Sequence, residues 1–357
     1  MKIKDGLKSL RKIIAKFLFD KKERSNKKLN FENVKSILFL RNDNKIGDMV
    51  ISTMLFREVK KRYPYIKITV LCGPDNKEII KHNPYVDEAI ELPNSFFKKL
   101  SVYAYLRKKK TDIAVDFFPF RPRPGHMFML RRINPGYLIG FYKKSYNMYD
   151  FSFEEDFFDK HISERYSRVL KLFAITPVSL KYDLYLEKKD EERVSELTEK
   201  SGGKFKIVIN PFAASVHRTI SYDKLKRLIE IIKGYANCHI YVLAPDINAA
   251  KLSGLSAQNV SIFDSKSVLE SAALIKYCDL VISPDTAIVH VAAAFEKKLV
   301  ALYLDYSNQS EKIDLIWAPN YDKAVQISVD TKNGVVENDI NNIDNDLIAA
   351  KIKELKG

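Results

Sequence analysis

Residues 280–304 read "LVISPDTAIVHVAAAFEKKLVALYL" and contain three elements in succession. The apolar run LVIS predicts a buried strand, and Pro284 begins a turn. The stretch TAIVHVAAAF predicts a helix, and KLVALYL predicts a second buried strand. Two apolar strands joined by a helix are typical of a parallel βαβ unit, so this stretch favours an α/β fold with helices on both faces of a parallel sheet.

The same alternation of strands and helices runs through the rest of the chain. In the first half, strands are predicted at 34–41, 66–72, 86–92 and 112–118, with a helix over 48–62 that ends before Pro64. The rhythm changes near 174–185. A second series then begins with the strand KFKIVINP and a helix over 221–233, for which Ser221 is the expected N-cap. Two doubly wound domains of similar size are therefore predicted, with a ligand cleft between their strand ends.

The predicted parts of the chain differ in composition. They are a basic amphipathic segment (1–33), an N-terminal domain (34–178), a C-terminal domain (179–335) and a final amphipathic helix (336–357). The three cysteines, at positions 72, 238 and 278, lie far apart and form no CxxC or Cys/His pattern. They predict buried thiols in a reducing compartment, not a disulfide framework or a zinc site. Neither a run of about 18 apolar residues nor a secretory signal is recognised.

The formal net charge of +15 is concentrated at the N-terminus. Residues 1–29 carry +8 of it, from nine Lys and two Arg against three acidic residues. Apolar residues also recur there along one helical face: Ile3, Leu7, Leu10, Ile14 and Phe17. We interpret the segment either as a helix on an anionic membrane surface or as a docked helix or disordered basic tail. No nucleic-acid-binding module accompanies the charge, so nucleic acid is not an expected partner.

Several familiar nucleotide-binding and catalytic motifs are absent from the sequence. There is no GxGxxG fingerprint, P-loop, HExxH or GxSxG. The acidic triplet DND at 344–346 precedes an amphipathic stretch, and we interpret it as a helix cap rather than a metal site. No metal and no cofactor are therefore predicted.

The stretch "RNDNKIGDMVIST" (41–53) follows the first predicted strand. Gly47 is expected to allow a tight turn, and Asp48 to begin a helix at the carboxyl edge of the sheet. A carboxylate in that place serves either as a general base toward a substrate hydroxyl or as a simple N-cap. Arg41 and Lys45 either meet anionic groups or hold Asp43.

The opening stretch places an acid, a hydroxyl and a histidine at a helix start: Asp285, Thr286 and His290. The first helical N–H groups have no intrahelical acceptor and lie at the positive end of the dipole, so such a start binds phosphate or diphosphate. The alternative is a capped helix with a buried histidine.

Two further loops contribute polar side chains. Ser215, His217 and Arg218 follow the first strand of the second domain, and the planar guanidinium of Arg218 suits a diphosphate. The other loop, at 117–132, follows a strand of the first domain and supplies four arginines as a clamp for an acidic acceptor: Arg121, Arg123, Arg131 and Arg132. For both loops, a solvated basic surface is the alternative.

These stretches together resemble the ADP-heptose:lipopolysaccharide heptosyltransferases, glycosyltransferase family 9. The resemblance rests on "RNDNKIGD", "INPFAAS" and "VISPDTAIVHVAAAFEKKLVALY", in that order, and covers roughly residues 34–330. It implies a GT-B fold, two Rossmann-like domains facing a cleft, with the donor bound mainly by the second domain. The sequence departs from the family at Ala287 and Phe212, where Gly is frequent, and at Thr219 and Ile220, where an aromatic pair is usual.

The resemblance also implies an inverting transfer without metal, in which Asp48 deprotonates the acceptor hydroxyl. Two groups of donor-binding residues are expected: Asp285, Thr286, Ala287, Ile288 and His290 at the helix start, with Ser215, Arg218 and Asp246 nearby. The expected acceptor-binding residues are Arg41, Lys45, Arg121 and Arg123.

The implied donor is ADP-heptose, and the implied acceptor is a phosphorylated, lipid-anchored core oligosaccharide. Residues 1–29 would hold the enzyme on the anionic cytoplasmic face of the bacterial inner membrane. The alternatives are a transferase of the same fold with another nucleotide sugar or acceptor, and a non-catalytic module that binds a nucleotide sugar at the membrane.

Overall fold

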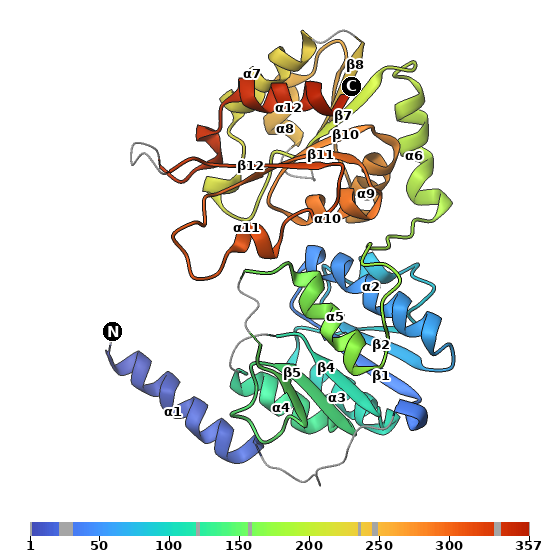
Figure 1. Cartoon of the computed structure of the whole chain (residues 1–357), viewed down its shortest axis with the longest axis vertical. Coiled ribbons are helices and arrows are strands. Elements are labelled where there is room, and N and C mark those ends of the chain that lie inside the picture. Colours follow the sequence, from blue (N-terminus) through green and yellow to red (C-terminus); the bar gives the residue numbers. More distant parts are fainter. Residues whose placement is uncertain are drawn as a thin grey trace. The chain divides into compact units, whose positions relative to one another are not determined.

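The computed structural model describes residues 2–20, 31–118, 122–155, 159–234, 237–244, 249–331 and 337–356. The chain forms two compact units (Figure 1). The first unit consists of Met1–Lys45, Phe56–Asp156 and Leu170–Thr176. The second consists of Ile46–Leu55, Phe157–Val169 and Pro177–Gly357. The segments 46–55 and 157–169 therefore belong with the second half of the chain, although they precede it in sequence.

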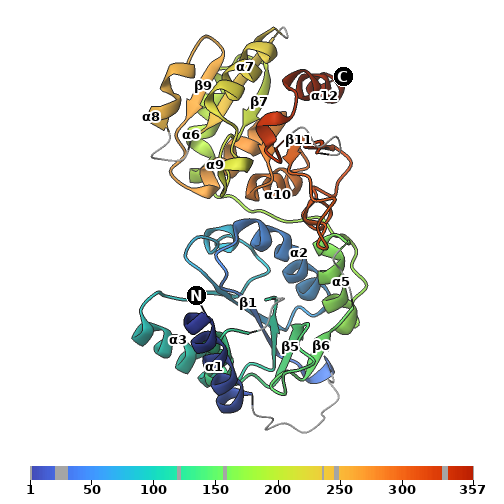
Figure 2. The same cartoon turned by 90° about the vertical axis from the view of Figure 1, so that its left-hand side faces the viewer.

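The first unit contains a parallel sheet of six strands in the order β3-β2-β1-β4-β5-β6. Three of these strands, β1, β5 and β6, are labelled in Figure 2. The strands are β1 (Ser36–Arg41), β2 (Lys67–Cys72), β3 (Glu88–Glu91), β4 (Ile113–Asp116), β5 (Tyr137–Phe141) and β6 (Phe151–Phe153). The helices of the first half are α1 (Lys2–Phe19), α2 (Ile46–Arg62), α3 (Phe96–Lys109), α4 (Pro124–Ile133) and α5 (Ile162–Leu172). The central strands β1, β2 and β4 are almost wholly buried, as strands covered on both faces must be.

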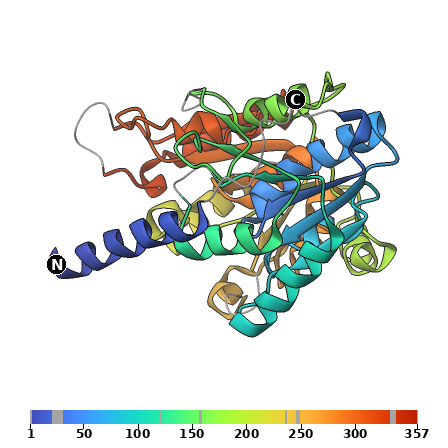
Figure 3. The ribbon, with the colours of Figure 1, turned by 90° about the horizontal axis from the view of Figure 1, so that it is seen from below.

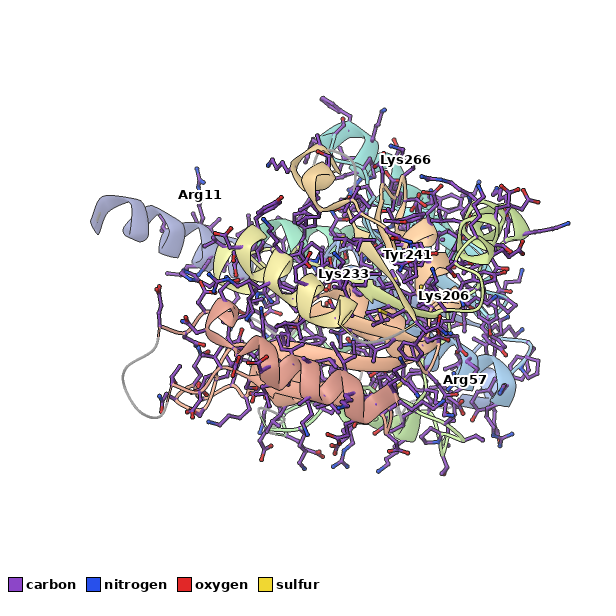
Figure 4. The ribbon with its side chains drawn as sticks, turned by 90° about the horizontal axis from the view of Figure 1, so that it is seen from above. Arg11, Arg57, Lys206, Lys233, Tyr241 and Lys266 are labelled. Atoms are coloured by element: carbon purple, nitrogen blue, oxygen red, sulfur yellow. The ribbon has the colours of Figure 1, made fainter. Side chains whose placement is uncertain are left out.

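The second unit repeats this arrangement, with a parallel sheet in the order β12-β11-β10-β7-β8-β9. The strands are β7 (Phe205–Ile209), β8 (Cys238–Leu243), β9 (Val260–Phe263), β10 (Leu280–Pro284), β11 (Lys298–Tyr303) and β12 (Ala324–Ser328). The helices are α6 (Lys188–Glu199), α7 (Tyr222–Lys233), α8 (Ala249–Leu252), α9 (Val268–Tyr277), α10 (Ala287–Ala294), α11 (Ile313–Ile316) and α12 (Asn345–Lys356). α12 lies beside α7 and buries Ile348 and Ile352 in the core of this unit (Figure 4).

Both sheets have a topological switch point, where the chain stops adding strands on one side of the first strand and continues on the other. It lies between β1 and β4 in the first unit and between β7 and β10 in the second. Loops leaving two neighbouring strands diverge there, so α/β sheets bind ligands at the carboxyl ends of these strands.

The predicted α/β fold of two doubly wound units is confirmed. Ser221 caps α7 as expected, because its side chain accepts a hydrogen bond from the backbone N–H of Lys224. The three cysteines are buried and unbridged, also as expected. The short strands β5 and β6 were not predicted. Among the described residues, no helix is both long and apolar enough to span a bilayer.

Candidate active site

The N-terminus of α10 is tied to the ends of two strands in the second unit. Thr286 is the N-cap, and its Oγ1 accepts a hydrogen bond from the N–H of Ile288 at 3.3 Å. Asn210, which follows β7, donates through Nδ2 to Thr286 Oγ1 at 3.1 Å and to Ser283 Oγ at 3.0 Å. The N–H of Val289 also donates to the carbonyl oxygen of Thr286, at 3.1 Å. The switch point of this sheet is therefore a polar, prearranged helix start.

Arg218 and Asp285 lie together beside this helix start. Arg218 Nη1 is 2.9 Å from Asp285 Oδ2 and 3.2 Å from the carbonyl oxygen of the same residue, and Arg218 Nε is 3.4 Å from Ser215 Oγ. The arginine side chain is 25% exposed, whereas that of Asp285 is 10% exposed. The carboxylate holds the guanidinium in place while part of it stays open to a ligand. Three predicted donor-site residues are thus brought together.

His290 is buried, being only 4% exposed, and its ring lies edge-on to the rings of Tyr182 and Trp317. Burial, with a smaller effect of nearby His161, lowers the pKa of His290 to about 3, so the ring is neutral at physiological pH. This position corresponds to the buried-histidine alternative and favours a packing role over contact with phosphate.

Gly47 explains how α2 approaches this histidine. α2 begins at Ile46, so Gly47 is helical and the predicted tight turn is wrong. A Cβ added at position 47 would lie 2.7 Å from Cδ2 of His290, closer than carbon atoms approach without a shift. Glycine therefore permits close packing of the two elements, and it keeps the adjacent Asp48, 9% exposed, beside α10. Asp48 lies in the first turn of α2, where Lys45 is the N-cap, so the simple N-cap interpretation of Asp48 is also wrong.

Burial of two histidines makes the stability of the protein depend on pH. Burial also lowers the pKa of His161, to about 4. A histidine in the unfolded chain titrates near pH 6.5. Below that pH the unfolded chain binds protons at these two histidines and the folded chain does not, so protonation favours unfolding. We expect stability to be full above pH 6.5 and to fall toward pH 4, by up to about 1.4 kcal/mol per pH unit for each histidine. Unfolding midpoints measured between pH 7 and 4.5 test this.

The matched variants are His290→Gln and His161→Gln, each of which should flatten the decline. The double variant should flatten it further. A decline equally steep in both single variants and the wild type would contradict the assignment.

The first unit has a cavity of about 690 Å³ at its own switch point. The loop after β1 and the end of β4 line it, together with α3 and α4. Its basic side chains are Lys45, Lys99 and Arg123, and its aromatic side chains include Phe96, Tyr103, Phe118 and Phe128. Asp43 and Asp116 also line it, so the three basic side chains outnumber two carboxylates. A cavity with this charge and an aromatic wall suits a sugar that carries anionic groups.

Asp116 positions a histidine in the wall of this cavity. Its Oδ2 is 2.9 Å from His126 Nε2 and accepts a hydrogen bond from Tyr149 Oη at 2.6 Å. Burial alone would raise the pKa of Asp116, but His126, buried Lys143 and the hydroxyl of Tyr149 together lower it to about 2. The carboxylate is therefore charged and orients the imidazole of His126 at the cavity.

The other predicted residues fall in several places. Lys45 and Arg123 line the cavity, whereas Arg41 is buried 5.3 Å from the ring of Phe117 and 3.4 Å from Asp43, so it holds the acid rather than lining the cavity. Arg132 lines a separate surface hollow with Arg107 and Lys108. Arg121 and Asp246 lie outside the described residues. Sequence reasoning missed Asn210, Asp116 and His126.

Two Rossmann-like units, each with a polar site at its switch point, are the architecture of GT-B glycosyltransferases. Residues 128–339 match the family model described as glycosyltransferase family 9 (heptosyltransferase). The chain therefore belongs to this family and is a glycosyltransferase, which confirms the predicted resemblance.

The relatives agree with this assignment over most of their length. The chain is 28% identical over 328 residues to a protein of Escherichia coli (strain K12) named "Putative lipopolysaccharide heptosyltransferase 4", covering 90% of this chain and 87% of the relative. A family 9 glycosyltransferase of Veillonella parvula superposes with a TM-score of 0.75 at 16% identity, covering 92% and 98% of the two chains. ADP-heptose lps heptosyltransferase II of E. coli superposes with a TM-score of 0.70 at 17% identity, covering 90% of this chain and 98% of that structure.

Proposed function

We propose that this chain transfers heptose from ADP-heptose to the inner core of lipopolysaccharide or lipooligosaccharide. The proposal rests on the second unit, where the Arg218–Asp285 pair lies at the capped start of α10 and where Gly47, next to Asp48 in the first turn of α2, packs against α10. The family and the names of its relatives support heptose as the sugar.

The donor diphosphate binds at the start of α10. The backbone N–H of Ala287 and the hydroxyl of Thr286 lie at the positive end of that helix, and Arg218 adds a charged fork. The N–H of Ile288 donates to the Thr286 oxygen and so fixes the hydroxyl in place. Asp285 orients the guanidinium and accepts hydrogen bonds from the sugar. These groups stabilise the charge that develops on the leaving ADP, so the proposed reaction needs no metal ion.

Asp48 acts as the general base. The acceptor hydroxyl loses its proton to the carboxylate as its oxygen attacks the anomeric carbon, and the bond from that carbon to the diphosphate oxygen breaks. A single displacement of this kind inverts the anomeric configuration. The carboxylate stands in the first turn of α2, where the dipole favours its charged form.

The acceptor sugar binds in the cavity of the first unit. Lys45, Lys99 and Arg123 meet its phosphates or carboxylates, and His126, held by Asp116, contacts a hydroxyl or an anionic oxygen. The acceptor is a phosphorylated, lipid-anchored core oligosaccharide. Residues 1–29, with their net charge of +8, hold the enzyme on the cytoplasmic face of the inner membrane, where that acceptor lies.

Thermal unfolding with a panel of nucleotide sugars tests the donor assignment. A ligand that binds only the folded state raises the unfolding midpoint, so ADP-heptose should raise it more than UDP- or GDP-sugars at equal concentration. A larger rise of the midpoint with another nucleotide sugar would identify that sugar nucleotide as the donor. The proposed fold and mechanism would then still hold. Binding of ADP-heptose without product, over several core acceptors, would instead indicate the non-catalytic module.

A further inference from the structure

A set of apolar side chains lies exposed on two helices of the first unit, and we call it the docking face. Its members are Leu10, Ile13, Ile14, Phe17 and Leu18 on α1, with Phe96 and Phe97 at the start of α3. Phe17 and Phe97 are the most open, at 78% and 79% exposed. An apolar group of this size on one face of a protein marks an interaction surface.

α1 is held on the first unit through residues that do not belong to the docking face. Ala15 is buried, the ring of Phe19 lies 5.6 Å from that of Phe128 on α4, and Asp20 Oδ1 accepts a hydrogen bond from the N–H of Met148. The C-terminal end of α1 therefore packs beside α4 (Figure 3), while the apolar side chains on the opposite side of α1 stay exposed.

The docking face is continuous with the wall of the cavity through Phe128. The ring of Phe96 lies 6.5 Å from that of Phe128 and 5.9 Å from that of Phe97. Both Phe96 and Phe128 also line the cavity. One row of aromatic rings thus runs from α1 across α4 to the tip of α3.

Basic side chains border this apolar surface. Arg11 and Lys12 are exposed on α1, and Lys98 is exposed beside Phe97 on α3; Arg11 points away from its helix into solvent (Figure 4). Exposed Phe, Leu and Ile bordered by Lys and Arg is the pattern of a helix that lies in the interface of an anionic bilayer. The positive charge beside these apolar side chains complements the anionic headgroups of such a bilayer.

We propose that the docking face inserts into the surface of an anionic phospholipid bilayer, with Phe97 as a second contact besides α1. The bilayer is then contacted by α1 and by the start of α3, where Phe96 lines the cavity. The cavity therefore lies close to the membrane surface from which a lipid-anchored sugar emerges. The assignment of the cavity as the acceptor site rests on the proposed function. The contact of Phe97 with the bilayer does not depend on it.

Fluorescence of a dye at position 97 tests this contact in the full-length chain. The three native cysteines are buried, so Phe97→Cys can be labelled selectively with a polarity-sensitive dye. Vesicles of phosphatidylglycerol and phosphatidylcholine should shift its emission to the blue, pure phosphatidylcholine much less, and added salt should reduce the shift. Tyr65→Cys, at an exposed aromatic position elsewhere in this unit, is the control and should not respond.

Vesicle co-sedimentation gives the second measurement. The double variant Phe17→Ser/Phe97→Ser should partition onto anionic vesicles about tenfold less than the wild type, while Tyr65→Ser binds normally. An unchanged partition, or a label at position 97 that ignores vesicles, would overturn the proposal. A blue shift that depends on protein concentration without vesicles would identify a second copy as the occupant and also overturn it.

Neither Phe17 nor Phe97 lines the cavity, so the double variant separates this proposal from the proposed function. With a water-soluble, delipidated core acceptor, its transfer rate should equal that of the wild type. If the wild type does not transfer heptose but position 97 still enters the bilayer, the proposed function fails and the membrane contact stands.

Discussion

Replacing Asp48 by Asn is expected to lower kcat for heptose transfer by about 10²–10⁴-fold, the usual contribution of a general base. Asn has nearly the same shape as Asp, so the packing of Gly47 on His290 and the start of α2 should be retained. The KM for ADP-heptose should change little, because the proposed donor contacts lie on α10 and at Arg218. Steady-state ADP release under saturating acceptor measures both quantities.

The control must also remove a carboxylate from the first turn of a helix. Asp223 occupies that position in α7 and is exposed. Asp223→Asn loses the same interaction with the helix dipole, which is worth under about 1 kcal/mol, and should keep the wild-type kcat. An Asp48→Asn variant as active as Asp223→Asn would remove Asp48 as the base.

Replacing Arg218 by Gln is expected to lower kcat/KM by about 10²–10³-fold, as does the loss of one group that stabilises charge on the reacting atoms. The change removes the charged fork and leaves the nearly buried carboxylate of Asp285 without this partner. Arg218→Lys keeps the charge but not the planar fork, so it should recover only part of the rate.

Arg227 provides the matched control for this second variant. It is exposed on α7, and Arg227→Gln removes the same charge without touching the proposed donor site. Measuring ADP-heptose affinity as well as the transfer rate separates weaker donor binding from slower transfer in the Arg218 variants. Wild-type kcat/KM in Arg218→Gln would mean that the diphosphate binds elsewhere.

Features that depend on neighbouring residues could be predicted from the sequence. The strand, turn and helix at 280–304 follow from apolar runs that surround Pro284, and Thr286 caps α10 because a hydroxyl before an apolar helix satisfies its first N–H groups. The order of such units then determined the fold class, because buried parallel strands need helices on both faces.

Features that depend on distant residues could not be predicted. Gly47 is an example, since the ring that requires it belongs to His290, far along the chain. Asn210 and Asp116 acquire their partners only when the strand order of each sheet is known. The burial of His290 likewise depends on Tyr182 and Trp317, which no local pattern connects to it.

The most direct test is to incubate the wild-type chain with ADP-heptose, a heptose-free core acceptor and a metal chelator, and to determine the product by mass spectrometry and NMR. We expect a core that has gained one heptose, with the anomeric configuration of the donor inverted and the yield unaffected by the chelator. A product that retains the configuration, a yield abolished by the chelator, or ADP-heptose that binds without transfer to any core acceptor would contradict this expectation.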